Sequence, residues 1–160
     1  MIILAIDPGT YESGWVRFDG ARVLECGIEG NEDLTGSVGQ SRADVMAIEK
    51  IEAMGMAVGS STFETVHWAG RMHQAWREPH NVRRITRRAV KLHLCGSMRA
   101  TDSNIRQALI DLLGAPGTKK APGPTYGVTS HAWSALAVAV VACAEMDALV
   151  ERPKAAAVTA

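Results

Sequence analysis

The chain has 160 residues, 47% of them hydrophobic, and its 17 lysines and arginines balance 17 aspartates and glutamates. This supports one compact domain and argues against two, so we predict a single domain over residues 1–150 and a disordered tail over 151–160. No apolar run approaches the roughly 20 residues of a membrane span, and no basic segment precedes an apolar one at the start. We therefore expect a cytoplasmic protein without a membrane partner. The three cysteines lack metal-ligand spacing, and their odd number argues against a disulfide framework.

The neutral total hides a segregation of charge along the chain. Residues 1–70 carry 4 basic and 11 acidic side chains, residues 71–106 carry 9 and 2, and residues 107–160 carry 4 and 4. The three blocks therefore have net charges of −7, +7 and 0. This pattern fits an acidic site for cations beside a basic surface for phosphates, and equally fits surface charges that mix in space.

The first half of the chain predicts strands. Residues 2–6 form a β-branched apolar run that ends at Asp7-Pro8-Gly9-Thr10, which is typical of a buried strand followed by a tight turn. Alternating segments at 14–18 and 21–27 flank an Asp19-Gly20 turn, so we predict three antiparallel strands. The stretch 29–42 predicts a loop or a short, poor helix, and 44–49 predicts a fourth strand.

The second half predicts mainly helices. Helices are expected over 62–76, over 87–95, and from a cap at Thr101 or Asp102 to residue 113, with a short strand at 81–85. Residues 115–129 are rich in Gly, Pro and Lys and predict an exposed loop. The long apolar stretch that begins at Ser130 predicts a helix buried in the core. The order of elements predicts a mixed α/β fold, in which three antiparallel strands and then parallel strands form a sheet flanked by helices.

Two carboxylates lie at predicted strand ends. Asp7 ends the first strand before a Pro-Gly turn, and Glu49 ends the fourth strand in an otherwise apolar run. Because ligands of open α/β sheets collect beyond the strand ends, these side chains could share one Mg²⁺ or Mn²⁺ ion. The purely structural alternatives are an Asx-turn over Gly9 for Asp7 and a solvated strand end for Glu49.

The short sequence motifs around these carboxylates closely resemble those of the RuvC family, in the compact form found in some phage-encoded resolvases. They are AIDPGT at 5–10, Gly14-Trp15, AIEKI at 47–51, Gly-Arg at 70–71, VKLHLCG at 90–96, DSNIRQAL at 102–109 and His-x-x-Ser-Ala-Leu-Ala-Val-Ala at 131–139. No single motif is decisive, but the order and spacing of the motifs together identify the resemblance. The resemblance runs from residue 2 to about residue 144.

The resemblance implies a ribonuclease H-like fold, a homodimer, and an endonuclease that cleaves Holliday junctions and other branched DNA by two-metal phosphodiester hydrolysis. Flaps and replication forks are further candidate substrates. Asp7 and Glu49 match the family's first two carboxylates. On the last helix His131 matches the first of two metal-facing positions three residues apart, and Ser134 occupies the second, where a carboxylate is usual. The implied metal ligands are Asp7, Glu49 and His131, with Mg²⁺ or Mn²⁺ as cofactor.

Ser134 is the departure that matters most, because a hydroxyl is a poor replacement for a charged oxygen ligand of a hard cation. Asp102 is the leading substitute and joins Asp7, Glu49 and His131 as a candidate catalytic residue, although a helix N-cap is its structural alternative. Glu52 and Glu64 are weaker substitutes. Otherwise water completes the coordination at a weaker site, or the protein binds junctions without cutting them.

The basic block, residues 71–106, supplies candidate DNA contacts, because the planar arginine side chain can donate two hydrogen bonds to one phosphate. Solvated helix faces are the alternative for these side chains. The candidates are Arg71, Arg83, Arg84, Arg87, Arg88, Lys91 and Arg99, with Lys119 and Lys120 on the predicted loop.

Three other functions fit parts of the sequence. A non-catalytic or weakly catalytic junction-binding protein is motivated by Ser134, and an RNA-processing nuclease of the same superfamily also carries the D-x-G-T strand. An actin-like sugar or acetate kinase shares the Asp-x-Gly-Thr turn. That fold needs two such domains and a phosphate-binding glycine loop, for which 160 residues are too few.

Overall fold

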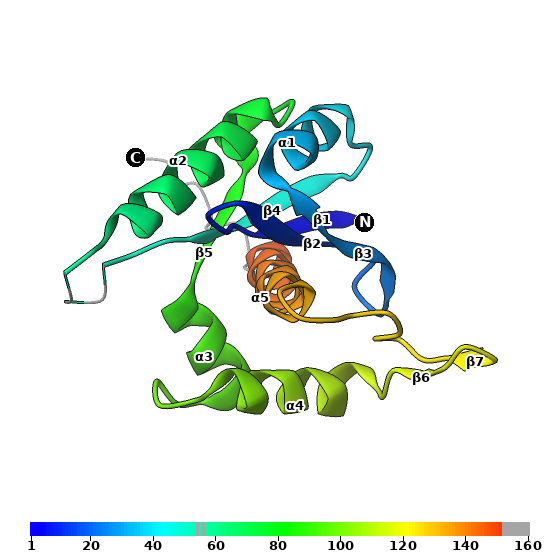
Figure 1. Cartoon of the computed structure of the whole chain (residues 1–160). Coiled ribbons are helices and arrows are strands. Elements are labelled where there is room, and N and C mark those ends of the chain that lie inside the picture. The colour runs from blue at the N-terminus through cyan, green and yellow to red at the C-terminus, as the bar shows by residue number, and fades with distance from the viewer. Residues whose placement is uncertain (54, 56, 152–160) are drawn as a thin grey trace, which may run out of the picture.

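A five-stranded mixed sheet lies at the centre of the protein (Figure 1). The computed structural model describes residues 1–53, 55 and 57–151. The strand order is β3-β2-β1-β4-β5, with β1–β2 and β2–β3 antiparallel and β1–β4 and β4–β5 parallel, which confirms the predicted sheet. The strands are β1 (Ile3–Asp7), β2 (Glu12–Phe18), β3 (Val23–Gly30), β4 (Val45–Lys50) and β5 (Arg83–Thr86).

Helices cover both faces of this sheet. Figure 1 shows α1 and α2 on one face and α5 on the other, with α3 and α4 packed beyond α5. The helices are α1 (Asn31–Gln40), α2 (Ser60–Ala75), α3 (Arg87–Cys95), α4 (Asp102–Leu113) and α5 (Ala132–Glu151), and a short 3-10 turn, η1 (Pro79–Asn81), precedes β5.

Successive side chains of each strand point to opposite faces of the sheet, so the hydrophobic core is divided into two halves. On β1, Ile3 and Ala5 face the side covered by α5, whereas Leu4 and Ile6 face α1 and α2. All four side chains are buried because helices cover both faces, which is why the strand reads as a continuous apolar run.

Helix α5 is buried along most of its length against the sheet. Its alanines let the helix lie close to β1 and β2, and residues 135–139 are fully inaccessible to solvent. Within the described residues it is the one helix long and apolar enough to span a membrane, but 61% of that window is buried inside the protein. Packing against the sheet therefore accounts for its apolar character.

The segment 29–42, predicted as a loop or a short, poor helix, is helical, and the predicted loop 115–129 differs from the structure. Residues 31–40 form the helix α1, because Leu34 and Val38 lie four residues apart and pack into the core, which outweighs the cost of two helical glycines. The predicted exposed loop 115–129 contains a small hairpin, β6 (Gly117–Thr118) with β7 (Ala121–Pro122). Its Thr125 is fully buried and donates a hydrogen bond of 2.9 Å to the Gly114 carbonyl.

The end of the chain also differs slightly from the prediction. Helix α5 begins at Ala132, so Ser130 and His131 precede it, and it includes Glu151. Ser130 has a positive φ of 41°, which non-glycine residues seldom adopt. The rest of the predicted tail, residues 152–160, lies outside the described residues.

Candidate active site

Asp7 and Glu49 lie at the same end of two neighbouring parallel strands. Ile6 of β1 is paired with Ile48 of β4, so the residue that follows each of them reaches the same edge of the sheet. Both carboxylates are largely buried, with side-chain exposures of 13% for Asp7 and 11% for Glu49. This low exposure contradicts the solvated strand end that was the alternative for Glu49.

A buried polar network holds the turn after Asp7. The Gly9 backbone N–H donates to Ser13 Oγ over 3.1 Å, the Ser13 hydroxyl donates to Asn31 Oδ1 over 2.6 Å, and Asn31 Nδ2 donates to the Gly9 carbonyl over 3.0 Å. Since the Gly9 N–H is bound by Ser13, the Asx-turn that was the structural alternative for Asp7 does not form. Ser13 and Asn31 were not predicted from the sequence, because the partners come from different elements.

His131 is brought to Asp7 by a close approach between β2 and the segment before α5. Gly14 is paired with Asp7 in the sheet, and a Cβ atom at position 14 would lie 2.5 Å from the His131 carbonyl oxygen. The absence of a side chain at Gly14 therefore allows His131 to lie against the sheet, where its Nδ1 is 3.2 Å from Asp7 Oδ2. The imidazole is 61% exposed, so it contacts both Asp7 and solvent. Asp7 and His131 therefore lie close together, as the sequence predicted.

Substituting Gly14→Ala tests this packing. The new methyl group would overlap the His131 backbone, so β2 and the start of α5 must separate. We expect a loss of about 1–3 kcal/mol in the free energy of unfolding, as for other overpacked sites. Gly36→Ala is the matched control, because a Cβ at that helical position meets nothing within 4 Å. Urea unfolding of both variants measures the difference, and equal stability would show that Gly14 does not limit the packing of His131.

The environment raises the pKa values of both carboxylates. Burial is the main cause for Asp7, and it is opposed by the hydrogen bond and charge of His131 and by the charge of Arg87. Burial also raises the pKa of Glu49 to about 7, helped by the negative charge of Asp7 and opposed by Arg87. Two nearby acids that are costly to ionise together are suited to binding a positive charge.

Arg87 links Asp102 to this pair. Thr101 is the N-cap of α4 in a capping box with Asn104, so Asp102 is not the cap. Its exposed carboxylate instead accepts a hydrogen bond from Arg87, whose Nη1 lies 3.8 Å from Glu49 Oε2. Asp102 therefore sits at the margin of the candidate site, with a guanidinium between it and Glu49.

The donor atoms fit a hard divalent cation only in part. Glu49 Oε2 is buried and has no hydrogen-bond partner among the described residues, and its ion pair with Arg87 at 3.8 Å is too long to be a hydrogen bond, so the oxygen can still accept a cation. Carboxylate oxygens are also the ligands that Mg²⁺ and Mn²⁺ prefer. Within the described residues, however, no three His, Cys, Asp or Glu side chains form a ready-made metal-binding group. Asp7 and Glu49 fit the metal, and His131 as a third ligand stays a prediction.

Ser134 lies in a pocket of about 340 Å³ that His131 also lines, although His131 precedes α5 and so does not share a helix face with Ser134. The other side chains of this pocket include Arg87 and Asp102. No carboxylate other than Asp102 lines it among the described residues, and Arg87 already pairs with Asp102. The structure thus gives no free substitute for a carboxylate at position 134 within this pocket.

The predicted DNA-binding residues do not form one surface. Arg71 joins α2 to α1 through two 3.1 Å contacts with Glu32 and stacks on Trp68, so its guanidinium is already occupied. Lys119 and Lys120 lie in the β6–β7 hairpin, at the other end of α4 from α3 (Figure 1). Arg83 and Arg84 on β5, Arg88 on α3 and Arg99 after it are exposed, whereas Lys91 is half-buried.

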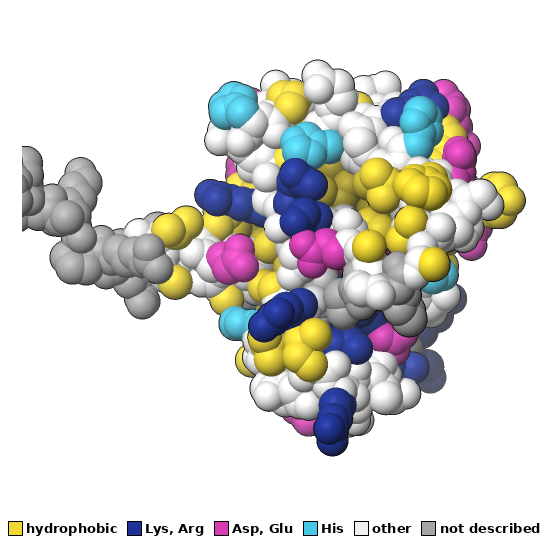
Figure 2. Space-filling view, turned by 90° about the vertical axis from the view of Figure 1, so that its left-hand side faces the viewer, with side chains coloured by type: hydrophobic (Ala, Val, Ile, Leu, Met, Phe, Trp, Pro, Cys, Tyr) yellow, Lys and Arg dark blue, Asp and Glu magenta, His cyan; other side chains and the backbone are white. Residues whose placement is uncertain are grey.

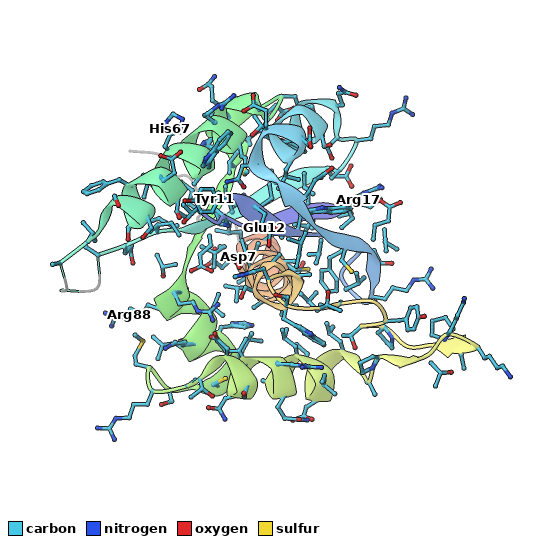
Figure 3. All side chains as sticks on the ribbon, viewed as in Figure 1. Asp7, Tyr11, Glu12, Arg17, His67 and Arg88 are labelled. Atoms are coloured by element: carbon cyan, nitrogen blue, oxygen red, sulfur yellow. The ribbon has the colours of Figure 1, made fainter. Side chains whose placement is uncertain are left out.

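The exposed face around α3 is where basic side chains gather. In Figure 3, Asp7 lies beside the start of α5, Arg88 projects from α3 on one side and Arg17 lies on the other side of the sheet. Figure 2 looks onto the side of the molecule that carries Arg88 and shows several Lys and Arg side chains around a few acidic ones. Arg87 and the end of β5 lie beside Glu49, and Arg88 follows Arg87 on the exposed surface of α3.

The sheet order, the helices on both faces and the placement of two carboxylates at adjacent strand ends define a ribonuclease H-like fold. Within that class the fold is that of RuvC. The "Thermus thermophilus RuvC structure" matches with a TM-score of 0.63 and 23% identity over 92% of this chain and 97% of that chain. "T. thermophilus RuvC in complex with Holliday junction substrate" matches with a TM-score of 0.64 and 21% identity over 88% and 92%. No family model and no curated protein sequence matches. The predicted resemblance is confirmed for the fold.

Proposed function

We propose that the protein is a divalent-metal-dependent endonuclease that cleaves Holliday junctions and other branched DNA. The observation that carries the proposal is the buried pair Asp7 and Glu49 at adjacent strand ends, one of whose oxygens has no hydrogen-bond partner among the described residues. The fold of RuvC, one of whose structures holds a Holliday junction substrate, supports branched DNA as the substrate. The exposed arginines of β5 and α3 supply charge for its phosphates.

Asp7 and Glu49 would hold Mg²⁺ or Mn²⁺, with His131 at the margin of the site. A bound divalent ion supplies Lewis-acid stabilisation of the negative charge that develops on the phosphate. The protein itself keeps both carboxylates largely out of water and keeps them close together. His131 Nδ1 lies 3.2 Å from Asp7 Oδ2 and helps to fix the direction of that carboxylate.

Arg87 partly balances the negative charge of the carboxylate pair and of Asp102. Its guanidinium lowers the pKa values of both Asp7 and Glu49 and pairs with Asp102. Arg87 is bonded to Asp102, and a guanidinium has further N–H groups that would donate to a phosphate beside the carboxylate pair. Arg87 and Asp102 therefore act on the substrate side of the carboxylate pair in this proposal.

A non-catalytic or weakly catalytic junction-binding protein is the second candidate. Ser134 supports it, because this hydroxyl lines a pocket with Arg87 and no unpaired carboxylate among the described residues. The RNA-processing alternative has no separate observation in its favour. The homodimer, and flaps and forks as substrates, stay predictions.

A cleavage assay tests the proposal. Labelled four-way junction, flap, fork, plain duplex and structured RNA are incubated with the protein in Mg²⁺, in Mn²⁺ and in chelator. We expect metal-dependent cuts in the four-way junction and none in plain duplex or RNA. Tight junction binding without cuts in either metal would favour the second candidate, and cuts in RNA alone would favour RNA processing. Light scattering of the free protein and of its junction complex measures the number of subunits.

A further inference from the structure

The pocket that contains Ser134 has a cationic lining. Arg87, Arg106 and His131 line it together with Asp102, whose charge is already compensated by its bond to Arg87. Within the described part of the chain Arg106 forms no ion pair. Arg106 therefore leaves an excess of positive charge in the lining, close to the carboxylate pair, because His131 lines the pocket and also contacts Asp7.

Arg106 is held in place by an aromatic ring. Its guanidinium carbon lies 4.9 Å from the centroid of the Trp133 ring, and Trp133 is buried on the first turn of α5. Stacking on a fixed ring orients the plane of the guanidinium while leaving the N–H groups at its edge free to donate. Arg106 was not among the residues predicted from the sequence to contact DNA, although it lies in the basic block.

Three hydroxyl groups complete the lining of the pocket. They come from Ser103 on α4, from Ser130 before α5 and from Ser134 within α5. Serine hydroxyls donate hydrogen bonds to phosphate oxygens but are weak ligands for hard divalent cations. Two guanidinium groups and three hydroxyls line this space, and their N–H and O–H groups can donate hydrogen bonds to a phosphate group.

We propose that this pocket binds a phosphate group of the cleaved DNA strand, next to the phosphate that is cut. The inference rests on the proposed function for the identity of the anion. It also gives Ser134 a role, because a carboxylate at position 134 would repel a phosphate, whereas a hydroxyl donates a hydrogen bond to it. Position 134 thus serves DNA binding instead of metal binding in this chain.

Arg106→Gln tests the pocket through binding alone. Binding to a four-way junction is measured in chelator over a range of salt concentrations, so no metal or cleavage enters. We expect binding about tenfold weaker and a slope of log K against log salt that is flatter by about 0.9. Arg42→Gln is the matched control, because Arg42 is also exposed but lies before β4, at the opposite end of that strand from Glu49. Equal binding by the Arg106 and Arg42 variants would overturn the inference.

Replacing single phosphates of the DNA with uncharged linkages identifies the phosphate that Arg106 contacts. Single methylphosphonate linkages are placed one at a time on both sides of the cut site, and binding is measured for wild-type protein and Arg106→Gln. We expect one linkage next to the cut site to weaken wild-type binding about tenfold and to add little to the loss in the variant, because both changes remove the same contact. Additive losses at every linkage would show that Arg106 contacts no single phosphate there.

Ser134→Asp separates an anion pocket from a cation pocket. In chelator we expect it to weaken junction binding about tenfold, whereas Ser134→Ala should weaken it only about two- to threefold. Unchanged binding in chelator together with a lower Mg²⁺ requirement for cleavage would make position 134 a metal ligand and overturn the inference. If wild-type protein neither prefers junctions nor cuts them, the proposed function fails instead. If wild-type protein cuts junctions and Arg106→Gln binds them normally, only the phosphate pocket fails.

Discussion

Asp7→Asn is expected to lower the rate of junction cleavage by about a thousandfold or more, because loss of a charged metal ligand removes several kcal/mol of stabilisation from the transition state. Junction binding in chelator should stay intact or become tighter. The substitution removes a largely buried negative charge near the expected phosphate while keeping the shape of the side chain. Single-turnover cleavage with saturating protein separates the rate of cutting from the strength of binding.

Two comparisons make this result specific to the site. Asp111→Asn, on the exposed surface of α4, should cut at the wild-type rate, because Asp111 contacts Gln107 and not the carboxylate pair. The melting temperature of wild-type protein should rise with added Mg²⁺ or Mn²⁺ and that of Asp7→Asn should not, since an ion that binds the folded state stabilises it. Cleavage by Asp7→Asn within tenfold of the wild-type rate would exclude Asp7 as a metal ligand.

The sheet could be predicted because its signals are local. The apolar run of β1, the turn residues that follow it and the alternation of β2 and β3 depend on neighbours in the sequence. The ends of β1 and β4 marked Asp7 and Glu49 for the same reason. Helix α1 was harder, because its glycines weaken the local signal and the burial of Leu34 and Val38 depends on tertiary packing.

The contacts around the carboxylates could not be predicted, because they join segments that are distant in the sequence. The separation between Asp7 and His131 is 124 residues, and only the resemblance to RuvC brought them together before the structure did. The bond between Arg87 and Asp102 depends on how α3 and α4 pack, and the capping box at Thr101 decides that Asp102 is free to form it. Gly14 gave a usable signal, since a glycine within a strand often marks a close approach of another segment.

The basic block of the sequence overstated the DNA surface. Charge counted along the chain cannot show that Arg71 is bound to Glu32, or that Lys119 and Lys120 lie on a hairpin at the far end of α4. It also could not single out Arg106, whose position depends on the ring of Trp133. Fewer of these cations therefore lie unpaired near the carboxylate pair than the count suggests, and Arg87 pairs with acids of the site itself.

Glu49→Gln is expected to stabilise the metal-free protein at pH 8 and to change its stability little at pH 5. Burial raises the pKa of Glu49 to about 7 in the folded protein, against 4.5 for the ordinary side chain. Between these two values the folded state binds more protons than the unfolded state, so the free energy of unfolding falls as the pH rises. A shift of this size corresponds to about 3 kcal/mol at pH 8, which the neutral glutamine avoids.

The test is urea unfolding in chelator at several pH values from 5 to 8, with wild-type protein, Glu49→Gln and Glu145→Gln. Glu145 is exposed on α5, so its variant should follow the wild-type curve at every pH. The difference between Glu49→Gln and wild type should grow from below about 1 kcal/mol at pH 5 to about 3 kcal/mol at pH 8. Added Mg²⁺ should stabilise wild-type protein at pH 8 and leave Glu49→Gln unchanged, because the ion needs the carboxylate charge that the protein otherwise finds costly. A difference that stays constant from pH 5 to pH 8 would show that ionising Glu49 does not destabilise the folded protein. It would then contradict the assignment of the buried carboxylate pair as a cation site.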